Sequence, residues 1–268
     1  MSKKIADAFK NGKAFIGFLT AGDPDLDTTK KIIKKAAQAG CDLVEIGIPF
    51  SDPIAEGPVI QKANIRALKN NVTTDDVFQM IDEIKNDVDI PMVFMTYLNV
   101  LFKYGYDRFL TRAKEVGICG VIIPDLPYEE KGELQSVAKN YGIEVVSLIA
   151  PTSEERIKMI AADAEGFVYA VSSLGVTGVR NEIKTDLESI TAAVKEVTDI
   201  PVAIGFGIST PEQAKKYAAV SDGVIVGSAI VKIIEQYGKD APNKVYDYVK
   251  SIKAVSYTHL TLPTNSLV

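Results

Sequence analysis

The sequence predicts an α/β protein folded as one (β/α)₈ barrel, the TIM barrel fold. Eight short apolar runs recur along the chain, with helical stretches between them. The runs are rich in Val and Ile and nearly continuous, as strands covered on both faces are. The 268 residues are enough for eight strand–helix units. A doubly wound parallel sheet is the alternative, but it seldom needs eight strands of this regularity.

The eight predicted strands follow one another at similar intervals. They are 14–19, 43–48, 91–96, 120–125, 144–150, 166–171, 201–207 and 223–227. The stretch 25–40 between the first two has apolar residues at helical spacing. The stretch 73–87 opens with Thr and Asp, which cap helices and stabilise their first turn. Thr210 and Pro211 predict another helix start, as cap and first helical residue.

No stretch of the chain has the composition of a linker, so residues 1–255 are expected to form a single barrel domain. Residues 2–11 are expected to form a short helix at the barrel's lower end. Residues 256–268 have no helical period and contain several Thr and Ser residues and a Pro. We interpret them as a cloning or read-through scar, with a natural disordered tail as the alternative. No function is assigned to His259, the only histidine.

Composition and charge exclude several classes of partner. The net charge is −5 and no block of Lys or Arg stands out, so nucleic acid is not expected. No apolar run approaches the roughly 18–20 residues of a membrane helix, and the N-terminus lacks the pattern of a signal peptide. The protein is therefore expected in the cytoplasm, away from membranes.

The two cysteines and the single histidine do not predict a metal site. Cys41 and Cys119 stand in matching positions just before apolar runs, where small buried hydrophobic residues are expected. Metal ligation would need further ligands nearby, and the sequence shows none. The only histidine, His259, stands in the C-terminal segment, so His-based triads and His-rich metal sites are excluded. No metal is therefore expected.

Glu45 is the first candidate catalytic residue, because barrel enzymes carry their active sites at the C-terminal ends of the strands. By strand alternation, Leu43 and Glu45 face one way. If Val44 and Ile46 pack against the helices, Glu45 points into the barrel mouth. An unpaired carboxylate there has a raised pKa, which suits proton transfer near neutral pH. A structural glutamate bonded to the backbone or to a lysine is the alternative.

Glu56 is the second candidate and stands in the loop after this strand. Prolines and glycines shape the loop, at Pro49, Pro53, Pro58, Gly47 and Gly57. Such a loop can carry an acid over the mouth, whereas a solvated surface glutamate is the ordinary interpretation. Asp52 in the same loop suits either an Asx turn or a contact.

Glycine-containing turns after three later strands indicate a phosphate site. They are SLGVTG (173–178), GFGIST (205–210) and VGSAIVK (226–232). Phosphate-binding barrels hold the anion beyond strands seven and eight, at the N-terminus of a short extra helix. Gly227 and Ser228 begin such a helix, whose free N–H groups and dipole favour an anion. Plain turns are the alternative.

Apolar side chains lie between the acids and these turns. They are Phe18, Ile122, Tyr169 and Phe206. Each alone is compatible with core filling, but as a set at strand ends they indicate a flat hydrophobic guest.

Taken together, the motifs resemble those of the tryptophan synthase alpha chain family. The resemblance is carried by DLVEIGIPFSDPIAEGPVIQ (42–61), FLTAGDP (18–24), YAVSSLGVTG (169–178), GFGIS (205–209) and GSAIVKIIE (227–235). It implies a carbon–carbon lyase of the last stage of L-tryptophan biosynthesis. The implied reaction is the retro-aldol cleavage of indole-3-glycerol phosphate to indole and glyceraldehyde 3-phosphate, with no cofactor and no metal on this chain.

The resemblance also implies a role for each candidate residue. Glu45 matches the glutamate that protonates the ring carbon bearing the side chain and helps remove the neighbouring hydroxyl proton. Glu56 stands where the second acid holds the indole N–H, and Thr177 would steady it when the loop closes. The phosphate cradle is matched by Gly178, Gly207, Gly227 and Ser228. The indole pocket is matched by Phe18, Ile122, Tyr169 and Phe206.

Two positions depart from the family's pattern. Most members carry Asp where this chain has Glu56, so the loop must absorb one more methylene. Ser173 stands where some members carry Arg. The family works as an αββα complex in which indole is channelled to a pyridoxal-phosphate beta chain. We expect that partner on the loop 48–53 and on the helical region after the strand 91–96.

Two other functions stay open from the residues. One is another phosphosugar barrel, an isomerase or synthase, but such enzymes usually need a catalytic Lys or a Cys–Asp pair at strand ends, and neither is visible. The other is a non-catalytic regulatory subunit that mainly activates a beta chain.

Overall fold

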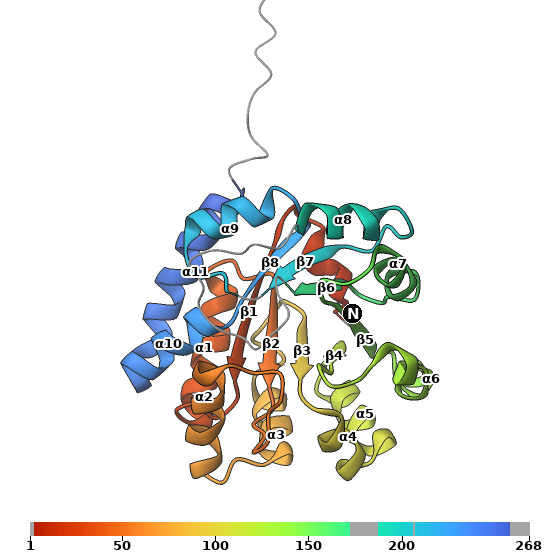
Figure 1. The fold of residues 1–268 in the computed structure, drawn as a ribbon. Coiled ribbons are helices and arrows are strands. Elements are labelled where there is room, and N and C mark those ends of the chain that lie inside the picture. Colours follow the sequence, from red (N-terminus) through yellow and green to blue (C-terminus); the bar gives the residue numbers. More distant parts are fainter. Residues whose placement is uncertain (1–2, 172–186, 206, 258–268) are drawn as a thin grey trace, which may run out of the picture.

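Eight parallel strands close into a barrel in chain order in the computed structural model, which describes residues 3–171, 187–205 and 207–257 (Figure 1). The strands are β1 Ala14–Thr20, β2 Leu43–Gly47, β3 Met92–Met95, β4 Gly120–Ile122, β5 Glu144–Ile149, β6 Val168–Val171, β7 Val202–Gly205 and β8 Gly223–Val226. The barrel closes where β1 pairs with β8. The predicted fold class is confirmed, and the doubly wound alternative is wrong.

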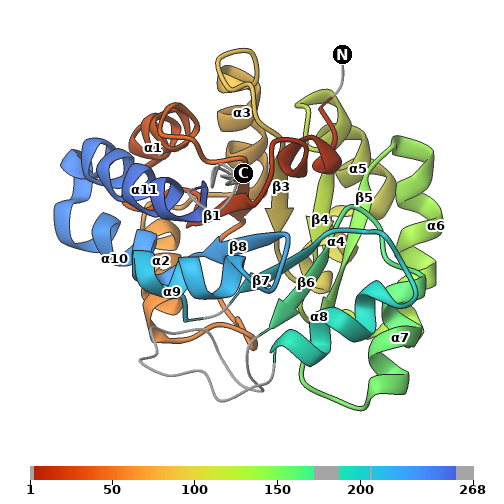
Figure 2. The same ribbon diagram turned by 90° about the horizontal axis from the view of Figure 1, so that it is seen from above.

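Helices surround the strands, as the view from above shows (Figure 2). They are α1 Leu26–Gln38, α2 Pro58–Lys69, α3 Thr74–Ile84, α4 Leu98–Tyr104, α5 Tyr106–Glu115, α6 Lys131–Tyr141, α7 Glu154–Ala162, α8 Leu187–Lys195, α9 Pro211–Ala218, α10 Ser228–Tyr237 and α11 Ala241–Tyr257. Three short 3₁₀ helices are η1 Ile5–Phe9, η2 Tyr128–Glu130 and η3 Gly238–Asp240. The extra helix predicted after the last strand is α10, and α11 follows it.

The helices begin where capping side chains satisfy free backbone N–H groups. Asp25 accepts from the Thr28 amide at 2.7 Å before α1. Thr73 caps α3, and Thr210 caps α9 with Pro211 at the first helical turn. These starts agree with the sequence prediction, because an N-cap needs only local chemistry.

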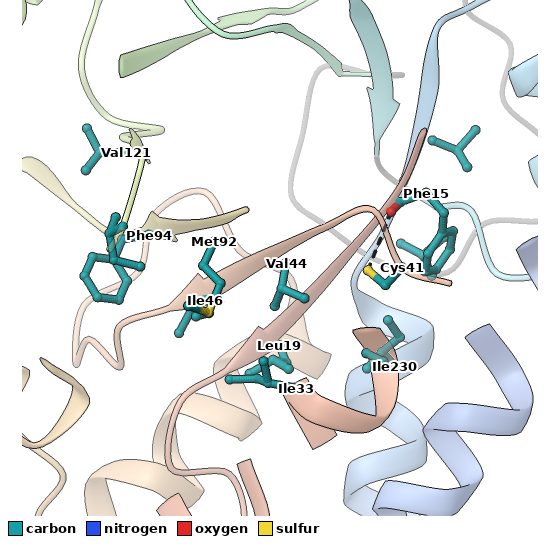
Figure 3. Packing of buried hydrophobic residues seen from close by; sticks show 14 of the residues in the cluster. Phe15, Leu19, Ile33, Cys41, Val44, Ile46, Met92, Phe94, Val121 and Ile230 are labelled. Atoms are coloured by element: carbon teal, nitrogen blue, oxygen red, sulfur yellow. Dashed lines mark hydrogen bonds between the residues drawn. The ribbon is translucent and has the colours of Figure 1, made fainter. Parts of the chain in front are cut away.

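Strand alternation divides the apolar side chains into two layers. Val44 and Ile46 of β2 belong to the cluster between strands and helices, where Figure 3 shows them near Leu19 and Ile33. Leu43 belongs to the second cluster, which fills the barrel interior. The predicted facing of β2 is therefore confirmed, and the same alternation directs Glu45 inward.

The N-terminal segment closes the end of the barrel at which the strands begin. Ile5 of η1 is fully buried and belongs to the interior cluster. A Cβ added to Gly120, the first residue of β4, would lie 2.6 Å from the Ile5 Cδ1. The predicted short helix is thus present, over Ile5–Phe9 rather than 2–11.

Both cysteines are buried apolar residues, as predicted. Cys41 lies in the outer cluster and Cys119 in the interior one, and burial raises the pKa of each thiol to about 12. Over the described ranges, no group of three or more His, Cys, Asp or Glu side chains is arranged to hold a metal ion. Within the same ranges, no helix has the length and apolarity needed to cross a membrane.

The last helix continues to Tyr257, two residues past the predicted end of the barrel domain. Residues 258–268, with His259, lie outside the described residues, so the origin of the tail and the division of the chain at residue 255 stay predictions.

Candidate active site

Glu45 is a carboxylate enclosed in the barrel interior. It pairs in register with Phe18 of β1 and Val93 of β3 and is fully buried. Neither carboxylate oxygen has a hydrogen-bond partner within the described part of the chain. Burial raises the pKa of Glu45 to about 8, because the charged form is poorly solvated there. A carboxyl group in this state holds a proton near neutral pH and can exchange it with a guest.

Glu56 is also enclosed, although it comes from the loop between β2 and α2. Its side chain is only 8% exposed, so the solvated interpretation is wrong. Asn64 of α2 donates from Nδ2 to Glu56 Oε2 at 2.5 Å. Burial raises the pKa of Glu56 to about 7, while hydrogen bonds from Asn64 and Tyr97 partly oppose the rise.

Tyr97 holds the loop in place from the end of β3. Its hydroxyl accepts from the Ala55 amide at 3.1 Å, and its ring stacks on Phe50 with centroids 5.1 Å apart. Gln61 adds a contact from α2, donating to the Glu56 carbonyl at 2.7 Å. The loop that carries the second acid is thus anchored on both sides. Asp52, by contrast, is exposed and accepts from the Ser51 hydroxyl at 2.5 Å. It does not line the pocket that contains Glu45 and Glu56.

One pocket brings the two acids together with most of the predicted binding residues. The predicted residues that line it are Phe18, Glu45, Glu56, Tyr169, Gly207, Gly227 and Ser228. Ile122 lies instead among the buried side chains of the barrel interior, in the same cluster as Tyr169. Thr177, Gly178 and Phe206 lie outside the described residues, as does Ser173.

Several lining residues were not predicted from the sequence. They are Ala55, Ile60, Met95, Pro124, Leu148, Ile208 and Ile225. Met95 ends β3 and Leu148 stands one residue before the end of β5, so a stricter use of the strand-end rule would have found both. Asn64 and Ile60 belong to α2 and gave no such signal, because only the folded helix brings them to the pocket.

Tyr169 forms an aromatic wall next to Glu45. The ring extends over Gly205 of β7, two residues beyond Ala203, its partner in the register. It fits because Gly205 has no side chain: a Cβ there would lie 2.5 Å from the Tyr169 hydroxyl. Burial, followed by the charge of Glu45, raises the pKa of Tyr169 well above its usual value. Tyr169 therefore stays neutral at any pH at which the protein would work.

The start of α10 lies at the pocket. Gly227 is the N-cap and Ser228 the first helical residue, and both line the pocket. A Cβ on Gly227 would lie 3.1 Å from Phe18 Cδ1, so any larger residue here would press against the Phe18 ring. Gly207 has a φ of +84°, which also favours glycine. The free N–H groups of the first turn can bind an oxyanion.

A larger cavity lies next to this pocket and shares Ala55, Pro124 and Leu148 with it. It measures about 540 Å³ and runs between β5 and the helices α6 and α7. No Asp or Glu occurs among its described lining residues, and its buried lysine, Lys131, already donates to the Ser147 hydroxyl and the Asp163 carbonyl at 2.9 Å each. The acid–base chemistry therefore belongs to the smaller pocket.

Two buried acids, an aromatic wall and a helix start in one pocket of a parallel barrel are the features of a barrel enzyme of the acid–base class. The family model described as tryptophan synthase alpha chain matches residues 5–258. The chain belongs to the tryptophan synthase alpha chain family, and it is an enzyme subunit.

Curated relatives agree with this assignment over nearly the whole chain. The tryptophan synthase alpha chain of Lacticaseibacillus casei is 49% identical over 253 residues, covering 94% of this chain and 95% of the relative. That of Thermoanaerobacter sp. (strain X514) is 49% identical over 245 residues, covering 91% and 94%.

Solved structures share the fold. Mycobacterium tuberculosis tryptophan synthase matches with a TM-score of 0.86 at 31% identity, covering 96% of this chain and 99% of that one. A chain of the tryptophan synthase complex from Pyrococcus furiosus matches with a TM-score of 0.83 at 36% identity, covering 91% and 99%.

Replacing Glu45 by glutamine is expected to stabilise the protein in a pH-dependent way. Glu45 binds its proton more tightly in the folded state, with a pKa of about 8 against 4.5 for the free side chain. The stability that it contributes is therefore full below pH 4.5 and is lost as the pH rises to 8. A glutamine side chain cannot ionise, so the variant gains on the order of 3 kcal/mol at pH 7. Urea unfolding at pH 4.5, 6, 7 and 8 measures this, and a difference independent of pH would contradict it.

Proposed function

We propose that the chain cleaves indole-3-glycerol phosphate to indole and glyceraldehyde 3-phosphate at this pocket. The observation that carries the proposal is the enclosure of two acids of raised pKa, Glu45 and Glu56, in one apolar pocket that ends at the N-terminus of α10. The apolar walls suit an indole ring, the two acids suit its N–H and the neighbouring hydroxyl, and the start of α10 suits a phosphate.

Glu45 acts as the proton donor and acceptor. It gives its proton to the ring carbon that bears the side chain, and as a carboxylate it then takes the proton of the neighbouring hydroxyl. The bond between this ring carbon and the carbon that bears the hydroxyl then breaks. Its electron pair returns to the ring, and the hydroxyl-bearing carbon becomes the aldehyde of glyceraldehyde 3-phosphate. Glu45 ends the cycle protonated, as its burial favours.

Glu56 stabilises the ring while it carries positive charge. A carboxylate that accepts from the indole N–H favours the cation formed when the ring carbon is protonated. Its pKa of about 7 lets it ionise once the guest N–H replaces bulk water. Asn64 and Tyr97 aim it. Thr177 is proposed to hold it when the loop closes.

The other end of the substrate is held by its phosphate. Gly178, Gly207, Gly227 and Ser228 are proposed as the cradle, of which Gly227 and Ser228 stand at the start of α10. Phe18, Ile122, Tyr169 and Phe206 are proposed to enclose the indole. Because the phosphate is remote from the breaking bond, its binding energy can position the ring against the acids.

No cofactor is proposed for this chain, and the chemistry above needs none. We propose that pyridoxal phosphate is held by a beta chain, that two alpha and two beta chains assemble as αββα, and that indole passes between them in the cytoplasm. The Pyrococcus furiosus relative is described as an a2b2 complex with mutual activation.

The partner surface is proposed at the end of the barrel to which the strands point (Figure 1). Ile54 in the loop after β2 is 71% exposed and Phe102 on α4 is 73% exposed. Both are large apolar side chains, and Ile54 directly precedes Ala55 of the pocket. Such exposure is typical of residues that a partner covers.

The alternative of a phosphosugar isomerase or synthase is disfavoured. No Lys lines the pocket within the described residues, and both cysteines are buried outside it. The regulatory-subunit alternative overlaps with the proposal, since a catalytic subunit can also activate a beta chain.

Glu45→Gln separates these two roles. The substitution keeps the shape and removes the proton donor, so cleavage should fall by at least about a thousandfold. Activation of a beta chain, measured as tryptophan formed from added indole and serine, should survive. Retained cleavage would overturn the mechanism.

Glu56→Gln is expected to lower kcat/KM by about a hundredfold to a thousandfold through loss of the carboxylate at the ring nitrogen. Asp52→Asn is the matched control, because it removes the same charge from an exposed position of the same loop. Its kcat/KM in the isolated chain should stay within about twofold of the parent value. Equal losses in both variants would assign the effect to loop charge rather than to the ring.

Phe102→Ser should weaken association with a beta chain about tenfold or more, because an aromatic side chain that the partner would cover is lost. Cleavage by the isolated chain should not change. Met159→Ser on α7 is the control, because it also replaces an exposed apolar side chain by serine, at a position outside the proposed partner surface. Calorimetric titration of both variants with a beta chain measures the difference, and unchanged affinity for the Phe102 variant would place the partner elsewhere.

A further inference from the structure

Arg66 of α2 joins three elements that are far apart in the sequence. Its Nε and Nη2 donate to the two carboxylate oxygens of Asp23 at 2.7 and 2.8 Å. Its Nη1 donates to Glu235 of α10 at 3.0 Å. Asp23 stands in the turn after β1, so a single guanidinium connects β1, α2 and α10.

Each of these three elements carries a different part of the pocket. β1 contributes Phe18, and α2 contributes Asn64, which holds Glu56. α10 begins with Ser228 at the proposed phosphate cradle. The position of the acid relative to the cradle therefore depends on how α2 sits against α10.

Arg66 lies at the interface that sets this position. An apolar cluster of Ile60, Ala63 and Val231 packs α2 and α10 around Phe18. Arg66 follows Ala63 by three residues and Glu235 follows Val231 by four, so each lies one helical turn along the same face. The ion pair thus extends the apolar contact between the two helices.

The Arg66–Asp23 pair has little freedom. Asp23 is only 1% exposed, and a bidentate guanidinium–carboxylate pair fixes both distance and angle. Asn70, the C-cap residue of α2, also donates to the Pro24 carbonyl at 2.6 Å. The turn after β1 is therefore held to α2 at two points. A lysine in place of Arg66 would keep the charge but could not maintain the fork to Asp23 and the contact with Glu235 together.

We propose that Arg66 is a positioning residue that sets the spacing between the acid-bearing part of the pocket and the phosphate cradle. One substrate can then reach both at once. This inference rests on the proposed function and deepens it. Its consequence is specific: loss of the spacing should harm a ligand that spans both parts and spare ligands that occupy only one, because joining two fragments helps only when both fit together.

Three probes test this in the full chain. Glycerol 3-phosphate occupies the cradle, indole occupies the ring pocket, and indole-3-propanol phosphate joins the two. In Arg66→Lys, the first two should bind within about twofold of the parent protein. The joined ligand should bind about tenfold or more weakly, since the benefit of joining is lost. Calorimetric titration measures all three affinities.

Two further variants complete the experiment. Glu235→Gln removes only the negative charge that Arg66 meets on α10, at an exposed carboxylate, and should weaken the joined ligand by about threefold. It serves as the test if Arg66→Lys fails to show cooperative thermal unfolding. Arg156→Lys is the matched control, because Arg156 makes a similar two-point pair with Glu129, at 2.8 and 3.2 Å, away from α2 and α10. It should bind all three probes as the parent does.

The outcomes separate the two proposals. Equal weakening of all three probes, or unchanged binding of the joined ligand in both Arg66→Lys and Glu235→Gln, would overturn the positioning role. If the parent protein binds the joined ligand no better than its two halves and does not cleave the substrate, the proposed function itself fails.

Discussion

The structure depends on keeping a carboxyl group inside a barrel without a partner. Glu45 is surrounded by apolar side chains from the strands, and this environment raises its pKa to about 8. An ion pair or hydrogen bond would solvate the carboxylate and return the pKa toward its usual range. The closed barrel provides the enclosure, because its strands block access from the sides and the N-terminal helix closes the end where they begin.

The second acid, Glu56, has hydrogen-bond partners. In the proposed reaction Glu56 must come close to the indole ring, and it is carried by a loop, which has no sheet to fix it. The chain meets this need with contacts from two sides: Asn64 on α2, and Tyr97 at the end of β3. The two acids therefore differ in kind. Within the described residues, Glu45 is buried without a partner, which raises its pKa, and Glu56 is held in place by its partners.

The barrel also has to keep distant parts of one site in register. Parallel strands bring their ends together, but the helices that carry Asn64 and Ser228 can still shift on the sheet. Apolar packing of α2 against α10 around Phe18 limits sliding. Directional contacts from Arg66 to Asp23 and Glu235 add an orientation that apolar packing alone does not impose.

The sequence by itself determined the eight strands, the helix caps and the inward direction of Glu45, because alternation and capping are local properties of the chain. It also indicated the glycine-rich start of α10, since that feature is written in consecutive residues. Only the tertiary structure decided that Glu56 is buried rather than solvated, that Asn64 and Tyr97 hold it, and that Arg66 joins α2 to Asp23 and to α10. Those relations join residues from different elements, and no local pattern encodes the packing that brings them into contact.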